Sequence, residues 1–191
     1  MAWDVHKPPV ERDDLRNALG FDMVLPAHKQ NMGELHNLSI RRGTLTDEDR
    51  FMVNDHIVRT LIMLKSMPWP DHLARVPDIA ANHHEKMDGT GYPRRLCAED
   101  LPVTDRIMAL ADVFEALTAG DRPYKPAKTL SESLRIMAFM GRDKHLDAQL
   151  FVYFLRSKVW MDYARQFMRP DQIDDVDIEA LARTAQPEAS T

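Results

Sequence analysis

The sequence predicts an all-α fold built as a single helical domain. Apolar residues recur at helical spacing along most of the chain, and no run alternates apolar and polar residues as a half-buried strand would. The length of 191 residues is sufficient for one domain with a substantial core. A content of 44% hydrophobic and 29% charged residues is typical of a globular protein.

The first 44 residues carry the weakest helical pattern. A short helix is predicted at residues 11–19, with Gly20 as its stop. Pro26 and Gly33 interrupt the chain that follows, where we find little periodicity.

The next helix is predicted to begin after Thr46. Thr46 is a favourable N-cap, and the three acidic residues after it suit the positive end of the helix dipole. Apolar residues keep helical spacing as far as Met67, and Pro68 follows as a stop. A second helix is predicted from about Pro77 to Glu85, because proline is favoured in a first turn.

A loop over residues 88–101 separates this pair from a strongly periodic helix at 103–118. The buried stripe of that helix is predicted to contain Ile107, Leu110, Ala111, Phe114 and Leu117. Further helices are predicted from Ser131, as the cap, to about Met140, and over residues 147–156 and 158–168. The acidic end of the chain is predicted to hold one short helix and to fray.

Composition restricts the partners and the compartment. A net charge of −5 gives no general support for binding a nucleic-acid polymer. Cys97 is the sole cysteine, which excludes an internal disulfide and a thiolate metal cluster and agrees with a reducing compartment. The N-terminus does not resemble a signal peptide, and no apolar stretch approaches the roughly 20 residues that cross a bilayer. We therefore expect a cytoplasmic protein without a membrane partner.

Four residues on three predicted helices have the chemistry of a metal site: His56, His83, His84 and Asp112. Asp112 has mostly apolar neighbours along its helix, and burying it unpaired would cost several kcal/mol. A divalent cation held by neutral imidazoles would compensate, and packed helices can direct such ligands into one bundle core. The alternatives are an ion pair between Asp112 and Arg106, and histidines with structural roles alone.

The chain after the histidine pair reads EKMDGTGYP, residues 85–93. Gly89 and Gly91 permit positive φ, whereas Pro93 restricts its own φ and the conformation of Tyr92. Such a loop can hold its backbone close to a ligand, and Tyr92 offers an aromatic face and a hydroxyl to a base or ribose. The alternative is an ordinary turn between helices.

A basic turn follows at residues 121–125, which read DRPYK. The planar fork of Arg122 matches phosphate oxygens, and Lys125 adds a point charge. If both project towards the metal, they form an anion-binding rim; otherwise the segment is a solvated surface turn.

Taken together, HHEKMDGTGYP and ALADVFEALTAGDRPYK resemble the HD-GYP family of metal-dependent phosphohydrolases. The stretch NLSIRRGTLTDEDRFMVNDHIV is similar to the helix that precedes this signature in the family. The resemblance covers roughly residues 38–168, and leaves 1–37 as a segment of unclear match and 169–191 as an acidic C-terminal tail. It implies an HD-domain-like helical bundle that hydrolyses the bacterial messenger cyclic di-GMP, with two or three divalent ions, commonly iron or manganese.

The resemblance also assigns roles to single residues. The implied metal ligands are His56, His83, His84 and Asp112. The implied substrate-binding residues are Gly89, Gly91, Tyr92, Pro93, Arg122 and Lys125. Two acids, Glu85 and Asp88, would orient the histidines by accepting hydrogen bonds from the ring nitrogens that do not face the metal. A metal-activated water would attack phosphorus in line while Arg122 stabilises the phosphoryl charge.

The His-Asp pair that gives the family half its name is absent from all 191 residues. In the family, that aspartate bridges two metals, so we expect an N-terminally incomplete HD fold with one or two ions and with reduced or lost hydrolysis. One alternative is a non-catalytic module that binds cyclic di-GMP or docks onto a signalling protein. Another is a helical module without a ligand that forms a homodimer through residues 159–168.

Overall fold

The computed structural model describes residues 17–26, 34–38, 40, 43, 45–119 and 128–186. Over these residues the regular structure is helical, with short 3₁₀ turns and one isolated bridge between Asp88 and Cys97 in place of strands. The predicted all-α class is confirmed. None of the helices in this part of the chain has the length and apolar character needed to traverse a bilayer.

The helix α2 (Asp47–Lys65) begins as the sequence predicts. Thr46 Oγ1 accepts a hydrogen bond from the Asp49 backbone N–H at 3.0 Å, and the Asp49 carboxylate accepts one from the Thr46 N–H at 3.2 Å. This reciprocal capping box satisfies two backbone donors and fixes the start of the helix. The helix ends at Lys65, with Ser66 as its C-terminal cap, two residues before the predicted limit and ahead of Pro68.

The helix α3 (Val76–Asn82) is shorter than predicted, because it ends three residues before Glu85. Pro77 lies in its first turn as expected, but His83 is the C-terminal cap and not a residue of the helix body. The reason lies in Glu85, whose buried carboxylate accepts hydrogen bonds from the backbone N–H groups of Arg94 and Leu96. These bonds draw the chain away from the helical path.

The helix α4 (Val103–Thr118) has the predicted bounds but a different buried face. Ile107 and Ala111 are exposed, contrary to the prediction. The acidic Asp105 lies inside instead, because neighbouring side chains satisfy its carboxylate with hydrogen bonds. The buried positions are Asp105, Ala109, Leu110, Phe114 and Thr118.

The remaining helices follow the predicted order: α5 (Leu130–Arg142), α6 (Ala148–Ser157), α7 (Val159–Phe167) and α8 (Ile178–Ala185), with the short α1 (Glu34–Leu38) before α2. The cap of α5 is Thr129 and not the predicted Ser131. Ser131 instead binds the carboxylate of Asp174, from a segment 43 residues further along the chain. The bounds of α6 and α7 agree with the prediction within two residues.

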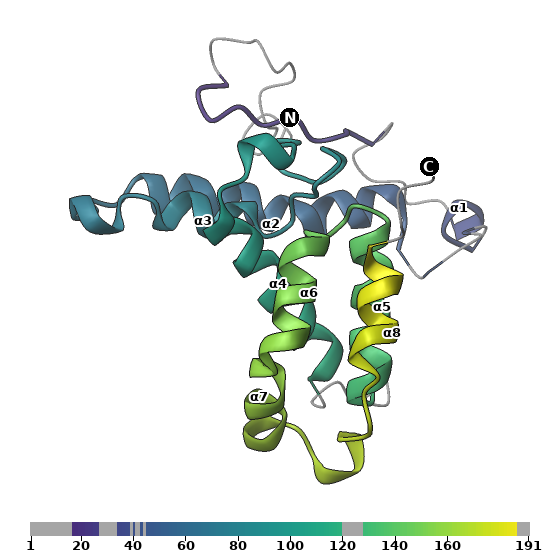
Figure 1. Cartoon of the computed structure of the whole chain (residues 1–191). Helices are drawn as coiled ribbons and strands as arrows, with labels where there is room; N and C mark the ends of the chain where they lie inside the picture. The colour runs from purple at the N-terminus through teal and green to yellow at the C-terminus, as the bar shows by residue number, and fades with distance from the viewer. Residues whose placement is uncertain are drawn as a thin grey trace, which may run out of the picture.

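These helices form two parts that meet at α4 (Figure 1). The helices α4, α5, α6 and α8 run alongside one another as a bundle, and α7 lies at its far end. The long helix α2 crosses the other end of the bundle, with α3 against it. The crossing matters for function because it places α2 beside the C-terminal end of α3.

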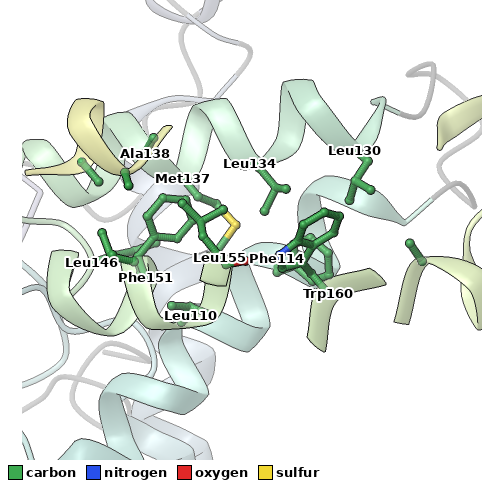
Figure 2. Packing of buried hydrophobic residues seen from close by; sticks show 14 of the residues in the cluster. Leu110, Phe114, Leu130, Leu134, Met137, Ala138, Leu146, Phe151, Leu155 and Trp160 are labelled. Carbon is green, nitrogen blue, oxygen red and sulfur yellow. Dashed lines mark hydrogen bonds between the residues drawn. The ribbon is translucent and has the colours of Figure 1, made fainter. Parts of the chain in front are cut away.

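The main hydrophobic core lies inside the bundle, where Leu134, Met137, Phe151 and Leu155 are fully buried (Figure 2). A smaller core joins α2 and α3 to residues 17–23 through Phe21, Val58, Leu61 and Ala81. The helix α8 contributes Ala182 and Ala185 to the main core. Up to residue 186, the predicted acidic tail is therefore a packed part of the bundle and not a frayed end.

Candidate metal centre

Three histidines converge where α2 passes the end of α3. His56 projects from α2, while His83 and His84 follow the last turn of α3. One ring nitrogen of each residue lies within 4.8 Å of those of the other two. The ring centroids of His84 lie 5.4 Å from His56 and 4.0 Å from His83. Three imidazole nitrogens at this separation fit a divalent transition metal.

Backbone contacts orient two of these rings. His56 Nδ1 faces the carbonyl oxygen of Val53, and His83 Nδ1 lies 2.7 Å from the carbonyl oxygen of Ala80. When Nδ1 donates its proton to a carbonyl, the lone pair is left on Nε2. The two rings are therefore held in the tautomer that presents Nε2 to a metal.

The third ring is kept in its neutral form by its surroundings. Burial lowers the pKa of His84 to about 4, with the neighbouring His83 acting in the same direction and Asp112 acting against them. A histidine with this pKa is uncharged near neutral pH. Because only the deprotonated ring nitrogen binds a cation, His84 is in the ligand-competent state.

Asp112 is exposed, and the expectation of a carboxylate buried among apolar neighbours is wrong. Its ligand atoms do not belong to the histidine group. Its charge acts against the lowering of the His84 pKa and adds to the effect of burial in raising the pKa of Tyr92. The alternative pairing with Arg106 is also wrong, because Arg106 forms its ion pair with Asp147 at 2.8 Å. Asp112 thus lies near the histidines, with its carboxylate open to solvent.

The glycine loop folds back onto the histidine pair. Tyr92 stacks on His84, with ring centroids 4.8 Å apart and planes 24° apart, and its backbone N–H donates to the His84 carbonyl at 3.3 Å. Burial raises the pKa of Tyr92 to about 12, so the phenol stays protonated. Gly89 has the expected positive φ of 75°, whereas Gly91 is required for space and not for a positive φ.

The two acids of this loop bind its own backbone. Glu85 is buried, and its oxygens accept hydrogen bonds from the N–H of Arg94 at 2.7 Å and the N–H of Leu96 at 3.0 Å. Burial raises the pKa of Glu85, while these bonds act in the opposite direction. Asp88 is exposed and accepts from the backbone and hydroxyl of Thr90. Within the described residues neither carboxylate hydrogen-bonds to a histidine ring, so both act on the shape of the loop.

Comparison with known proteins agrees with this geometry. The HD domain family matches residues 5–150 of the chain. The chain belongs to the HD domain family, and to its HD-GYP type. The match begins inside the N-terminal segment for which the sequence showed no clear resemblance.

Curated relatives of this HD domain are phosphodiesterases of cyclic dinucleotides. A cyclic di-GMP phosphodiesterase of Vibrio cholerae is 37% identical over 120 residues, which cover 61% of this chain and 24% of the relative. A 3'3'-cGAMP-specific phosphodiesterase 1 of the same organism is 44% identical over 78 residues, covering 41% and 18%. The cyclic di-GMP phosphodiesterase response regulator RpfG of Xanthomonas campestris is 31% identical over 145 residues, covering 74% and 37%. The HD domain thus spans between 18% and 37% of the length of these relatives.

A buried polar network behind the histidines was not predicted from the sequence. Asp105 has no exposed side-chain surface and accepts hydrogen bonds from Arg75 at 2.9 Å and from the Asn82 amide at 2.6 Å. The Asn82 oxygen in turn accepts from Arg94 at 2.6 Å. Because Asn82 immediately precedes His83, this network fixes the end of α3 from which the histidine pair projects. An acid on the apolar face of a predicted helix was the signal that could have revealed it.

The basic pair Arg122 and Lys125 lies outside the described residues of the HD domain, because 120–127 are not among them. Its predicted place beside the metal stays a prediction. The described groups fit a divalent cation by their chemistry: three imidazoles, two with Nδ1 at a backbone carbonyl and one held neutral by burial.

Proposed function

We propose that this chain is a metal-dependent phosphodiesterase domain that acts on cyclic di-GMP. The observation that carries the proposal is the convergence of three imidazoles within 4.8 Å, beside a loop that can face a nucleotide. The activities of the relatives support the substrate class. A divalent iron or manganese ion is the expected cofactor, as the family resemblance implies; imidazole ligands suit iron, and a carboxylate such as that of Asp112 suits manganese.

His56, His83 and His84 would hold the ion, and Asp112 would add a carboxylate from the solvent side. When bound, the ion supplies Lewis-acid polarisation of a phosphoryl oxygen and activation of water. Arg122 and Lys125 would contact the phosphate oxygens of the substrate. Tyr92 is protonated and stacks on His84. Its hydroxyl would donate a hydrogen bond to the substrate, and its ring would hold the His84 imidazole in place.

Hydrolysis should be slow, because the sequence has no His-Asp pair to supply a bridging carboxylate for a second ion. The same absence favours a second candidate, in which the domain binds the dinucleotide without cleaving it. Binding draws on the loop and the basic pair as well as on the metal, whereas rapid attack on phosphorus needs a fully activated water.

Metal content and turnover, measured on one preparation, test both candidates. Protein purified under reducing conditions should bind about one Mn²⁺ or Fe²⁺ per chain. A free metal concentration of about 100 times Kd should raise the free energy of unfolding by about 2.7 kcal/mol. His83→Ala should abolish this stabilisation, whereas His72→Ala, at an exposed histidine of the 3₁₀ turn Asp71–Leu73, should not.

Chromatography of cyclic di-GMP incubated with the metal-loaded protein then separates the candidates. Linear dinucleotide or GMP as product supports the hydrolase, and binding without product supports the binding module. A wild-type protein that neither retains metal nor gains stability from it would refute the metal centre itself.

A further inference from the structure

A cavity of about 400 Å³ lies next to the histidine centre and shares a wall with it. The shared wall is Tyr92, which lines the cavity and also stacks on His84. The other walls come from residues 22–26 and from the first two turns of α2, which end one turn or less before His56. The cavity is large enough for a small organic ligand.

The walls of this cavity are held together by the fold. The backbone N–H of Asp22 donates to the carbonyl of Pro93 at 2.8 Å, which ties the first wall to the glycine loop. Phe21, next to Asp22, is buried in the smaller core against α2. The cavity is therefore a fixed feature of the site and not a gap between loose segments.

Two arginines, Arg50 and Arg95, line the cavity. In the part of the chain that the structure describes, the guanidinium groups of Arg50 and Arg95 form no hydrogen bond and no ion pair. Arg95 also has a φ of 53°, a left-handed conformation that is uncommon for a residue other than glycine. Unusual backbone of this kind is concentrated at ligand sites.

The cavity combines these donors with acceptors and aromatic faces. Asp22 and Asp47 contribute carboxylates, and Phe51 and Tyr92 contribute rings. Guanine presents two acceptors, O6 and N7, on one edge and the N1–H and N2 amino donors on the other. Arginine binds the O6/N7 edge with both arms of its fork, and carboxylates accept from amino donors. Adenine has an amino donor in place of O6, so it cannot accept a hydrogen bond from an arginine at that position.

We propose that this cavity binds a guanine base of the dinucleotide whose phosphate lies at the histidine centre. Arg50 and Arg95 donate to the O6/N7 edge, Asp22 and Asp47 accept from N1–H and the N2 amino group, and an aromatic ring covers the base. The inference rests on the proposed function for its ligand and adds selectivity for guanine over adenine. The relatives include enzymes for cyclic di-GMP and for 3'3'-cGAMP. Each of these nucleotides contains a guanine, so the cavity would accept both and would discriminate against cyclic di-AMP.

Calorimetric titration of the EDTA-treated protein with GMP and with AMP tests the proposal without any turnover. GMP should bind more tightly than AMP by roughly tenfold, the scale of one arginine–guanine pair. Arg50→Ala and, separately, Arg95→Gly should remove most of this preference, and glycine at position 95 keeps the left-handed conformation. Arg183→Ala, at an exposed arginine of α8, is the matched control and should leave both affinities unchanged.

Equal affinity for GMP and AMP, or no binding of either, would overturn the proposal. Equal weakening of both nucleotides by Arg50→Ala would do so as well, because it would assign the arginine to phosphate. Thermal unfolding of each variant verifies that the fold is intact. A guanine preference without metal binding or hydrolysis would refute the proposed function and leave this inference standing. Equal cleavage of cyclic di-GMP and cyclic di-AMP, unaffected by both variants, would refute the inference and leave the function standing.

Discussion

Position 91 should tolerate no side chain, because the glycine loop lies directly against the backbone that follows the histidine pair. A Cβ atom on Gly91 would lie 2.5 Å from Glu85 Cα and 2.5 Å from the Lys86 nitrogen. Ordinary contact for such an atom begins at 3.4 Å, so the Gly91→Ala substitution must separate the two segments by 3.4 − 2.5 = 0.9 Å. Both clashing atoms are backbone atoms, so no flexible side chain can turn away.

Separating the two segments should lower the free energy of unfolding. Inserting a methyl group into a well-packed site typically costs about 1–3 kcal/mol, and a backbone clash belongs at the upper end. For a domain of this size, each kcal/mol lowers the midpoint of thermal unfolding by about 2–4 °C. We therefore expect Gly91→Ala to lower the midpoint by about 6–12 °C. Because Glu85 directly follows His84, the same movement should weaken the binding of Mn²⁺.

Thermal unfolding followed by circular dichroism, with EDTA and with Mn²⁺, measures both effects. Gly141→Ala is the matched control, because the added Cβ meets its nearest neighbour, Ala185 Cβ, at an ordinary 3.4 Å. That variant should unfold within about 3 °C of the wild type, since alanine is also the better residue inside α5. A Gly91→Ala protein that unfolds at the wild-type temperature and responds equally to Mn²⁺ would refute the close approach of loop and histidine pair.

Three further substitutions test the support of the site and the bundle. Asp105→Ala should lower the free energy of unfolding by about 1–3 kcal/mol in urea, because the buried amide of Asn82 loses its acceptor; an unchanged midpoint would contradict the network. Leu134→Ala should cost about 2–5 kcal/mol by the same measurement, because the side chain is fully buried in the main core, whereas the half-exposed Val159→Ala should cost little. Burial alone would raise the pKa of Asp147, but its hydrogen bond from Arg106 and those from the start of α6 lower it below 3.8 overall. A group with a depressed folded-state pKa stabilises the fold above its unfolded pKa and loses this effect as the pH falls through the folded value. The free energy of unfolding of Asp147→Asn should therefore fall less steeply than that of the wild type below about pH 4. The same pH dependence in both proteins would count against the pairing of Asp147 with Arg106.

The features predicted correctly from the sequence are those that neighbouring residues decide. Thr46 was predicted as the N-cap of α2, and it forms that cap with a partner three residues later. The bounds of α4 follow from its uninterrupted periodicity and the residues around it. The convergence of the three histidines was also expected, as one interpretation of their chemistry and then as what the family resemblance implies.

The features predicted wrongly depend on partners far away in the chain. The end of α3 is decided by bonds from Glu85 to the backbone 9 and 11 residues later. The buried face of α4 is decided by Asp105, whose partner Arg75 lies 30 residues earlier. The cap of α5 was misplaced because Ser131 binds Asp174, 43 residues later. Periodicity within one helix contains none of this information.

Among the described residues, the groups that hold His83 and His84 in place lie close together in the sequence, and this bears on what the missing His-Asp pair removes. His83 and His84 follow a helix end fixed by Asn82, Asp105 and Arg94, and the loop held by Glu85 covers His84 with Tyr92. All of these groups lie between residues 75 and 105, so the positions of the two rings do not depend on a bridging aspartate from the N-terminal region. A bridging carboxylate adds a second cation and a more strongly activated water, whereas the imidazoles alone suffice to hold one cation. The loss of the pair should therefore reduce catalysis more than metal binding, which is the difference between a slow hydrolase and a binding module of the same fold.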